Sequence, residues 1–271
     1  MTKLELLYQE LLKREVVTYK EIEDIFKEIG EKPSVSFRYL YTEYIHKLLQ
    51  KGKLLHPQKG LYVAVPPTKI NVNSYQPDKY LIASKIQSLY YLGFHTALEL
   101  YGCAYSVYNE IYIVVPSEQK FRNFTFKQIH YRPVFTAYAT KGVKKRLHKN
   151  HELIMSTPSR TFLDCINRPE YVGGWEECLK SLEGLSGVNA QEIQQLLTTI
   201  RKDMLFRKTG FILTLLSDNP YYTGLIDTLQ PFLQRHIGTS PMYLKKGIKS
   251  TLNTSWKLYV PIGFEYYLKG V

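Results

Sequence analysis

Over the first fifty residues, hydrophobic side chains recur at intervals of three and four, the spacing that places them along one face of a helix. The pattern predicts helices over residues 2–13, 19–29 and 37–50. Each helix then has one face that packs and one that meets water. The inward face of the third helix is expected to hold Phe37, Leu40, Tyr41, Tyr44, Ile45 and Leu48.

The ends of these helices carry matching signals. Thr2 with Glu5, and Thr18 with Glu21, have the capping-box spacing in which each side chain accepts a hydrogen bond from the backbone N–H of the other residue. Gly52 follows the third helix, at a position where glycine tolerates a left-handed backbone. These signals support the helix boundaries that the hydrophobic spacing predicts.

A short hairpin is expected after the third helix. Residues 53–56 and 61–63 are predicted strands around a turn that carries Lys59. Three helices followed by a hairpin are typical of a winged helix-turn-helix domain, which we place at residues 1–65, with the third helix as the recognition helix in the major groove of DNA. The alternative is a three-helix module that binds protein, because helix-turn-helix patterns are short and permissive.

The exposed face of the third helix mixes hydrogen-bonding groups with few net charges. Such a face suits the reading of base edges better than the holding of phosphates alone, whereas a basic hairpin tip suits the DNA backbone. The side chains expected to contact DNA here are Arg38, Tyr39, Thr42, Glu43, His46, Lys47, Gln50, Lys53 and Lys59.

Beyond residue 65 the pattern changes. Residues 66–78 contain three prolines and no helical stripe, which predicts a linker. Helices are then expected over residues 79–89 and 97–101, capped by Asp78 and Thr96, and from about residue 160 to 233; strands are expected over residues 110–115, 127–134 and 151–155. The predicted fold class is α+β: the winged helix-turn-helix, then a mixed α/β domain, then a mostly helical C-terminal portion. Residues 79–271 form one region, with a further boundary near residue 187.

Composition narrows the class of protein. With 271 residues, 44% of them hydrophobic, the chain suits two or three folded domains and not a largely disordered protein. It has no apolar run of about eighteen residues and no apolar core of a secretion signal near its start, so we expect a cytoplasmic protein without a membrane segment. Cys103, Cys165 and Cys178 lack paired ligand spacing and are odd in number, which predicts reduced core thiols rather than a disulfide framework or a zinc site.

The formal net charge of +12 indicates a polyanionic partner, and its position matters more than its size. Residues 66–168 hold 14 Lys/Arg against 6 Asp/Glu, and residues 120–149 hold nine Lys/Arg and no acid. Aromatic residues interrupt this basic tract, as in proteins that track a nucleic-acid backbone. The alternative is a solvated strand face with a lysine-rich loop. We include Lys144, Lys145 and Arg146 among the expected DNA contacts.

Residues that could carry chemistry are few. His148 and His151 could share a helix face, but cations surround them and no carboxylate or thiolate lies beside them, so a loop or a helix end is preferred over a metal site. Glu110, Glu118 and Lys120 have the residue types of a metal-dependent nuclease, although Glu118 falls outside the predicted strand that should position it. No nucleophile elbow or phosphate-binding loop is present. We expect no enzyme, no cofactor and no metal.

Several segments, in chain order, match one family: residues 52–54 with 59–62, residues 91–98 with 101–102, residues 158–177, residues 205–210 and residues 256–261. Together they resemble the AbiEi family of antitoxins and predicted transcriptional regulators of type IV toxin-antitoxin systems. Ser159 departs from the pattern, where the family would place Glu, and a lost carboxylate there would remove an ion pair with Arg160. We interpret Asp164, Arg168 and Glu170 in this segment as a helix end held by an Arg–carboxylate pair.

The resemblance implies a protein encoded beside a nucleotidyltransferase toxin. It implies that the winged helix binds repeats in the promoter of its own operon, and that the C-terminal region supplies antitoxicity. The leading hypothesis is therefore a DNA-binding antitoxin and autorepressor, with double-stranded DNA and the cognate toxin as partners and no membrane. The alternatives are a stand-alone winged-helix regulator and a metal-dependent nuclease that uses Glu110, Glu118 and Lys120.

Overall fold

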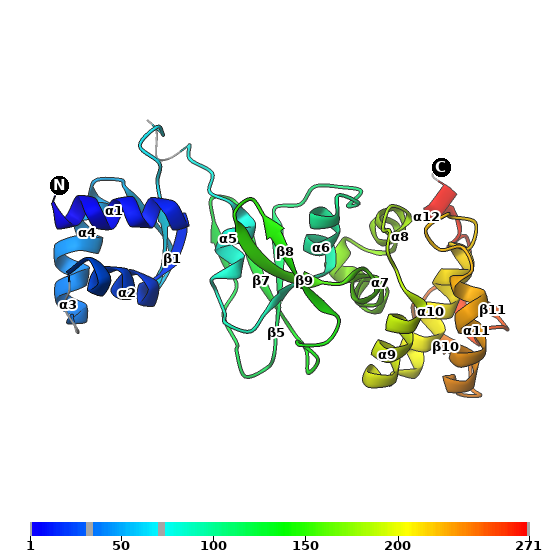
Figure 1. Ribbon diagram of the computed structural model, residues 1–271. Helices are drawn as coiled ribbons and strands as arrows, with labels where there is room; N and C mark the ends of the chain where they lie inside the picture. The colour runs from blue at the N-terminus through cyan, green and yellow to red at the C-terminus, as the bar shows by residue number, and fades with distance from the viewer. Residues whose placement is uncertain (1, 31–34, 70–73, 270–271) are drawn as a thin grey trace. The chain divides into compact units, whose positions relative to one another are not determined.

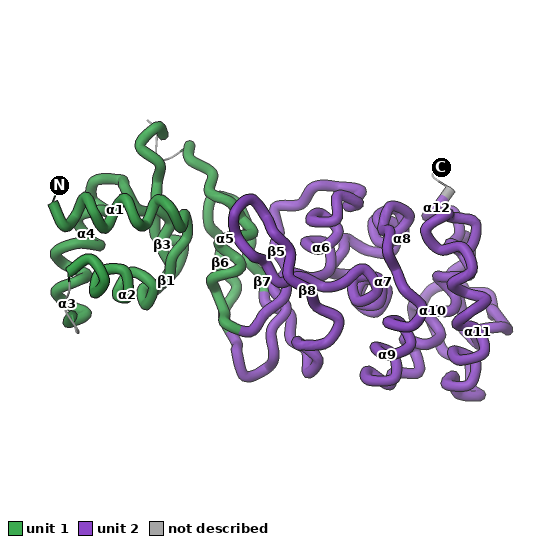
Figure 2. Tube along the Cα trace, in the orientation of Figure 1, with its two compact units in different colours: residues 1–88, 121–132 green, residues 89–120, 133–271 purple. Residues whose placement is uncertain are grey.

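The computed structural model of the protein describes residues 2–30, 35–69 and 74–269 (Figure 1). Helices and short strands occur throughout, so this is a mixed α/β protein. The chain divides into two compact units (Figure 2): unit 1 comprises residues 1–88 and 121–132, and unit 2 comprises residues 89–120 and 133–271. Each unit has a hydrophobic core of its own.

The first part of unit 1 contains the three helices and the hairpin that the hydrophobic spacing predicts. Its elements are α1 (Lys3–Arg14), β1 (Val16–Thr18), α2 (Tyr19–Gly30), α3 (Phe37–Leu40), η1 (Tyr41–Ile45), α4 (His46–Gln50), β2 (Leu54–Gln58) and β3 (Leu61–Ala64). The segments α3, η1 and α4 follow one another without a break. They form one helix over residues 37–50, whose middle turn η1 is a wider π turn. We call it the 37–50 helix.

Both predicted capping boxes are present. The Thr2 N–H donates to the Glu5 carboxylate at 2.8 Å, and the Glu5 N–H donates to the Thr2 hydroxyl at 3.2 Å. The Thr18 N–H donates to Glu21 at 2.8 Å, and the Glu21 N–H donates to the Thr18 hydroxyl at 3.3 Å. Gly52, after α4, has a φ of +64°, as its left-handed role requires. The local signals therefore locate these ends correctly.

Three strands form an antiparallel sheet in the order β1-β3-β2. The register aligns Val16 with Val63 and Leu54 with Ala64. Gly60, with a φ of +79°, lies at the tip of the β2–β3 hairpin. The sequence pattern predicts this hairpin but not β1, because three residues between two helices are too few to show the alternation of a strand.

The core of this part of unit 1 draws on all three helices, through Leu7, Leu11, Ile22, Ile25, Leu40, Ile45 and Leu48. Burial of each such side chain stabilises the fold by about 1.5–3 kcal/mol. The prediction is wrong for Phe37, whose side chain is 62% exposed and stacks on Tyr41 with ring centroids 5.8 Å apart. Phe37 lies in the first turn of the helix. The spacing of hydrophobic residues predicts which way a side chain points around the helix axis, but it does not show where along the helix the core ends.

The rest of unit 1 consists of α5 (Lys79–Ser84), β6 (Phe124–Phe126) and the first part of β7 (Ile129–Phe135). Residues 66–69 and 74–78, in the predicted linker, form no helix or strand, and residues 70–73 lie outside the described residues. Asp78 caps α5 as predicted, since its carboxylate accepts the N–H of Tyr80 at 2.9 Å. The helix ends five residues earlier than predicted, where the Ser84 hydroxyl donates to the Leu81 carbonyl at 2.7 Å and competes with the helical pattern.

Unit 2 begins with strands in the order β5-β4-β9-β8. They are β4 (Tyr91–Leu92), β5 (Glu110–Val115), β8 (Val143–His148) and β9 (His151–Ser156). β4 pairs antiparallel with β5 and parallel with β9, and β8 pairs antiparallel with β9. Helix α6 (Phe94–Tyr101) packs against β5, and α7 (Pro158–Asn167) packs against both α6 and β9 (Figure 1). The sequence pattern predicts β5 in full and β9 one residue short.

Two predictions for this part of the chain need correction: the start of one strand, and a segment that the sequence does not predict to be a strand. The strand predicted over residues 127–134 is β7, which starts at Ile129, because Lys127 and Gln128 have positive φ and form the β6–β7 turn. The basic segment predicted as a loop or a helix end is strand β8. His148 and His151 therefore face one another across the β8–β9 hairpin instead of sharing a helix face.

Helix α6 begins three residues before its predicted start. Its N-cap is Gly93, while Thr96 lies inside the helix and its hydroxyl accepts the Tyr112 N–H at 2.8 Å. A Cβ at Gly93 would lie 2.8 Å from the ring of Tyr91 and 2.9 Å from Val114. The tight turn from β4 into α6 therefore needs glycine, and this steric requirement overrides the capping preference of threonine.

The remainder of unit 2 is helical, as predicted, but also contains a small sheet. The helices are η2 (Pro169–Val172), α8 (Trp175–Glu183), α9 (Ala190–Ile200), α10 (Asp203–Leu215), α11 (Leu225–His236) and α12 (Tyr266–Lys269). The small sheet consists of β10 (Met242–Tyr243), β11 (Ser250–Asn253) and β12 (Leu258–Pro261). Its strands pair in the order β10-β12-β11. Trp256 is buried against α10, where a Cβ at Gly210 would lie 2.3 Å from its ring. The sheet escapes prediction because strands of two to four residues show no periodicity.

The residues from 158 to 174 hold two Arg–carboxylate pairs. Ser159 is buried, and its hydroxyl accepts an N–H from the residue that caps α9 at 2.9 Å. Arg160 pairs instead with Asp164, one turn later, at 2.8 Å between Nε and Oδ1. Arg168 pairs with the exposed Glu170 at 3.3 Å, which fits the expected helix end. Asp164 thus supplies the carboxylate that residue 159 lacks.

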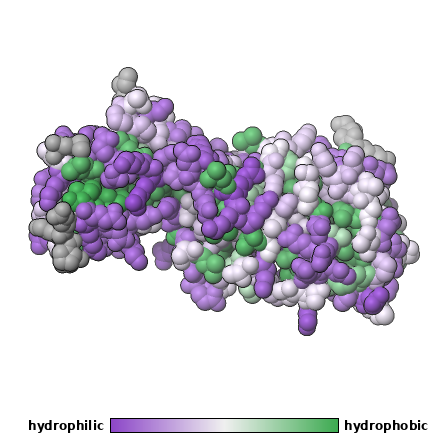
Figure 3. All heavy atoms as spheres, viewed as in Figure 1, coloured by the Kyte–Doolittle hydropathy of each residue, from purple (hydrophilic) through white to green (hydrophobic). Residues whose placement is uncertain are grey.

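Exposed hydrophobic side chains are dispersed on the face that Figure 3 shows, where hydrophilic residues separate several small hydrophobic patches. Val107, Leu147 and Ile262 are among the most exposed, at 87%, 70% and 61%. Within the residues that the structure describes, no helix combines the length and the apolar character needed to cross a bilayer.

Candidate DNA-binding surface of unit 1

The 37–50 helix is anchored on one side and exposed on the other. Leu40, Ile45 and Leu48 are buried in the core of unit 1. The exposed side carries the predicted contacts Arg38, Tyr39, Thr42, His46, Lys47 and Gln50, with Glu43 half-buried at its margin. The structure thus brings the predicted helical contacts onto one solvent-facing surface.

Charge on this surface is partly cancelled. Lys47 pairs with Glu43, one turn earlier, at 2.6 Å. Thr42 and Gln50 are exposed, and neither side chain enters a hydrogen bond among the described residues. The centre of the helix therefore presents neutral donors and acceptors, which is the chemistry that distinguishes base edges.

Two tyrosines stiffen the start of this surface. The rings of Tyr39 and Tyr44 meet edge to face, with centroids 5.8 Å apart. The hydrogen bond between the Tyr44 and Tyr39 hydroxyls and partial burial raise the pKa of Tyr44 to about 12. Tyr39 is 49% exposed and remains accessible to a ligand.

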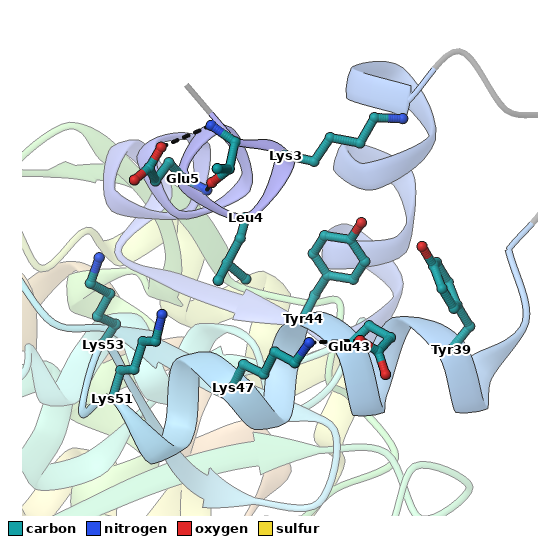
Figure 4. Close-up of a pocket in the computed structure, with 10 residues that line it drawn as sticks. Lys3, Leu4, Glu5, Tyr39, Glu43, Tyr44, Lys47, Lys51 and Lys53 are labelled. Carbon is teal, nitrogen blue, oxygen red and sulfur yellow. Dashed lines mark hydrogen bonds and ion pairs between the residues drawn. The ribbon is translucent and has the colours of Figure 1, made fainter.

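A basic cleft of about 450 Å³ lies between the first turn of α1 and one flank of the 37–50 helix (Figure 4). Its cations are Lys3, Lys47, Lys51 and Lys53, and its acids are Glu5 and Glu43. Both acids are already engaged: Glu43 pairs with Lys47, and Glu5 accepts the Thr2 N–H, which holds the pKa of its carboxyl below its usual value. The cleft therefore offers a net positive charge to a ligand.

A second hollow, of about 610 Å³, continues the first. The two share Glu5, Lys51 and Lys53, and the second adds Lys69. The Lys53 ammonium lies 4.5 Å from the centroid of the Tyr8 ring, a cation–π contact that holds it in place. We call the combined surface the lysine groove, lined by Lys3, Lys47, Lys51, Lys53 and Lys69. Sequence reasoning identifies Lys47 and Lys53 but misses the other three.

The remaining predicted contacts lie on two separate elements. Lys59 is exposed at the tip of the β2–β3 hairpin. Lys144, Lys145 and Arg146 lie on β8 of unit 2, and the cations of the basic tract from residue 120 to 149 are divided between the two units. Lys145 also pairs with Glu152 of β9, which lies outside the tract, at 2.8 Å.

The residues of the nuclease alternative are not assembled as a metal centre. Glu110 begins β5 and accepts a hydrogen bond from the Tyr112 hydroxyl, whereas Glu118 is exposed in the turn after that strand. Lys120 lies 6.0 Å from the ring centroid of Phe135. Over residues 2–30, 35–69 and 74–269, no group of three or more His, Cys, Asp or Glu side chains has the geometry to hold a metal ion.

Comparison with known proteins gives a fold likeness. No family model and no curated protein matches the sequence. The chain is similar in structure to the RV2827C protein from Mycobacterium tuberculosis, with a TM-score of 0.67 and 16% sequence identity, over 99% of this chain and 93% of that chain. At this level of identity the likeness concerns the fold alone: a mixed α/β architecture that extends over nearly the whole length of both proteins.

Proposed function

We propose that residues 1–65 form a winged helix-turn-helix domain that binds double-stranded DNA, with the 37–50 helix in the major groove. The observation that carries the proposal is the neutral, hydrogen-bonding face of this helix beside the lysine groove. Base edges need directional donors and acceptors, and phosphates need cations. The order of helices and strands in unit 1 agrees with a winged helix, with the β2–β3 hairpin as the wing.

The residues divide into two roles. In this proposal, Arg38, Tyr39, Thr42, His46 and Gln50 read bases. Lys59 at the hairpin tip and the cations of the lysine groove hold phosphates. A protein with this division gains most of its affinity from the cations and its sequence preference from the helix.

Replacing Thr42 or Gln50 with alanine is expected to weaken binding to the cognate operator while leaving binding to scrambled DNA unchanged. A good base-edge contact is worth about 1–3 kcal/mol of discrimination at one base pair. Titration of labelled operator and scrambled duplexes at the same salt concentration measures the difference. Each of the two side chains is exposed, so neither change disturbs the core.

A matched control is Thr198→Ala, a solvent-exposed threonine on α9 of unit 2. It removes the same hydroxyl without touching the proposed surface. If the Thr42 and Gln50 variants discriminate operator from scrambled DNA as well as the wild-type protein does, the 37–50 helix does not read sequence.

We further propose that the protein represses its own operon and acts as the antitoxin of a nucleotidyltransferase-type toxin, without catalysis of its own. The resemblance of residues 52–54, 59–62, 91–98, 101–102, 158–177, 205–210 and 256–261 to AbiEi proteins supports this proposal. A compact unit 2 that is separate from the proposed DNA-binding domain is consistent with a second role for the C-terminal part.

Co-expression with the neighbouring gene tests the antitoxin role. Cells that express a toxic neighbour alone are expected to stop growing, and this protein is expected to restore growth. Restoration should persist in the Thr42→Ala/Gln50→Ala variant when toxin expression is driven by an unrelated promoter, because protection is assigned to unit 2. A neighbour without toxicity, or toxicity that this protein does not relieve, would leave only the role of DNA-binding regulator.

A further inference from the structure

A cavity of about 330 Å³ lies within unit 2, away from the residues assigned to DNA binding. Its walls come from β4, the start of α6, β5, the chain around the end of β7, α7 and the chain from the end of α9 to the start of α10. Its lining includes the side chains of Tyr91, Phe135, Arg160, Asp164, Arg168 and Lys202. A volume of this size suits a small organic ligand.

Arg160 is fixed in one wall of the cavity. It is 2% exposed and donates to Asp164 at 2.8 Å, to the Tyr91 hydroxyl at 2.7 Å and to the backbone carbonyls of Tyr138 and Lys141 at 3.0 and 2.8 Å. Burial alone would lower the pKa of Arg160, but Asp164 and Tyr91 together raise it, so the guanidinium stays charged. Because hydrogen bonds to four partners and one ion pair hold Arg160 in this wall, the wall is rigid before any ligand arrives.

The more exposed part of the cavity has a different character. Phe135 is 42% exposed, the Arg168 side chain is 36% exposed and Lys202 is exposed at the start of α10. The Arg168 guanidinium is oriented by the Tyr171 ring, whose centroid lies 4.1 Å away. The ring of Phe135 and the cations of Arg168 and Lys202 therefore line the same cavity and are accessible to a ligand.

The charges of the lining residues do not cancel. Three cations, Arg160, Arg168 and Lys202, line the cavity with one acid, Asp164, and the exposed Glu170, which is not a lining residue, partly offsets the charge of Arg168 at 3.3 Å. Asp164 is committed to Arg160 and also accepts from the Tyr91 hydroxyl at 2.8 Å. A ligand therefore meets a positive opening with an aromatic surface, which favours an anion that also carries a flat ring.

We propose that this cavity binds a nucleotide, with its base against Phe135 and its phosphate between Arg168 and Lys202. The bound group is either a free mononucleotide or the terminal nucleotide of a single strand, since both present the same base and phosphate. Arg160, Asp164 and Tyr91 act as positioning residues that keep the cavity open. The proposal does not depend on DNA binding by unit 1.

Calorimetric titration of the full-length protein with AMP, ribose 5-phosphate and a 5′-phosphorylated single-stranded hexanucleotide tests the proposal. AMP is expected to bind at least about tenfold more tightly than ribose 5-phosphate, because only AMP stacks a base on an aromatic ring. Phe135→Ala should remove that preference. A hexanucleotide that binds far more tightly than AMP would identify the strand as the source of the ligand, and equal affinities would identify the mononucleotide.

Charge variants supply the second readout. Lys202→Gln, and the double change Arg168→Gln with Lys202→Gln, are expected to weaken AMP binding by at least about tenfold, whereas the matched pair Arg235→Gln with Lys245→Gln should have no effect. Arg235 and Lys245 are exposed in unit 2 and lie outside the cavity. The proposal is overturned if neither AMP nor the hexanucleotide shows saturable binding at millimolar concentration, or if Lys202→Gln and the control pair bind AMP alike.

Discussion

Replacing Arg207 with alanine is expected to lower the free energy of unfolding by about 2–4 kcal/mol, because a buried guanidinium and its charge-assisted hydrogen bonds are lost together. The Arg207 side chain is 1% exposed and donates to both oxygens of Asp203, at 2.6 and 3.0 Å. It also donates to the carbonyls of Lys257 at 2.6 Å and Gly238 at 2.9 Å. Its removal therefore takes two donors from the Asp203 carboxylate and one from each carbonyl, leaves the Gly238 N–H and the Lys257 ammonium as the remaining donors to Asp203 and to the Gly238 carbonyl, and opens a cavity beside α10.

Urea denaturation followed by circular dichroism measures this loss. The matched control is Arg235→Ala on α11, where the side chain is exposed and the expected change stays within about 0.5 kcal/mol. Equal losses in the two variants would mean that the contacts of Arg207 contribute no more than an ordinary surface arginine.

The ion pair between Arg207 and Asp203 also makes the free energy of unfolding depend on pH. The hydrogen bond from Arg207 lowers the pKa of the Asp203 carboxyl below its usual value. A depressed folded-state pKa contributes stability that is present above the unfolded value and is lost as the pH falls through the folded value. Wild-type protein should therefore lose this contribution below about pH 4, while Arg207→Ala should lack this part of the acid dependence.

The second large effect is expected in the lysine groove. Changing Lys47, Lys51 and Lys53 together to glutamine should weaken DNA binding at 0.1 M salt by up to a few hundredfold, about 0.9 logarithmic units for each phosphate contact. The slope of log affinity against log salt should flatten by up to about 2.7 units. Preference for operator over scrambled DNA should persist, because phosphates carry no direct base information.

The control for this variant is a second triple change in unit 1, in which Lys13, Arg14 and Lys27 become glutamine. These residues lie outside the lysine groove, and the change in net charge is the same. A general electrostatic effect would flatten the salt dependence of both triples equally. Such a result, with both proteins folded, would contradict phosphate binding in the groove.

Prediction from sequence succeeds here where the signal is local. The capping pairs Thr2–Glu5 and Thr18–Glu21 and the six-residue strand β5 are all found where expected. It fails where tertiary contacts decide, as at Thr96, whose capping preference yields to the close packing around Gly93. It also fails for β1, β10, β11 and β12, which are too short for periodicity to appear.

The candidate site shows the same division. The exposed face of the 37–50 helix follows from helical spacing, because its residues are neighbours in sequence. The lysine groove does not, because Lys3 and Lys69 join one surface only after α1 and the chain beyond β3 have packed. Of the three lysines that sequence reasoning misses, Lys51 is the easiest to predict, because it and Lys53 lie on either side of Gly52.

Strand β8 is the last strand in the order of its sheet, so one of its edges presents backbone N–H and C=O groups that a strand of another molecule can pair with. Lys144 and Lys145 are exposed on this strand, as is Leu147 at 70%. Lysines on an edge strand oppose such pairing, because a second copy would bring like charges together. These cations therefore protect the protein against self-association. Neutralising them would favour aggregation, and in a binding assay the removal of aggregated protein from solution would resemble a loss of DNA binding.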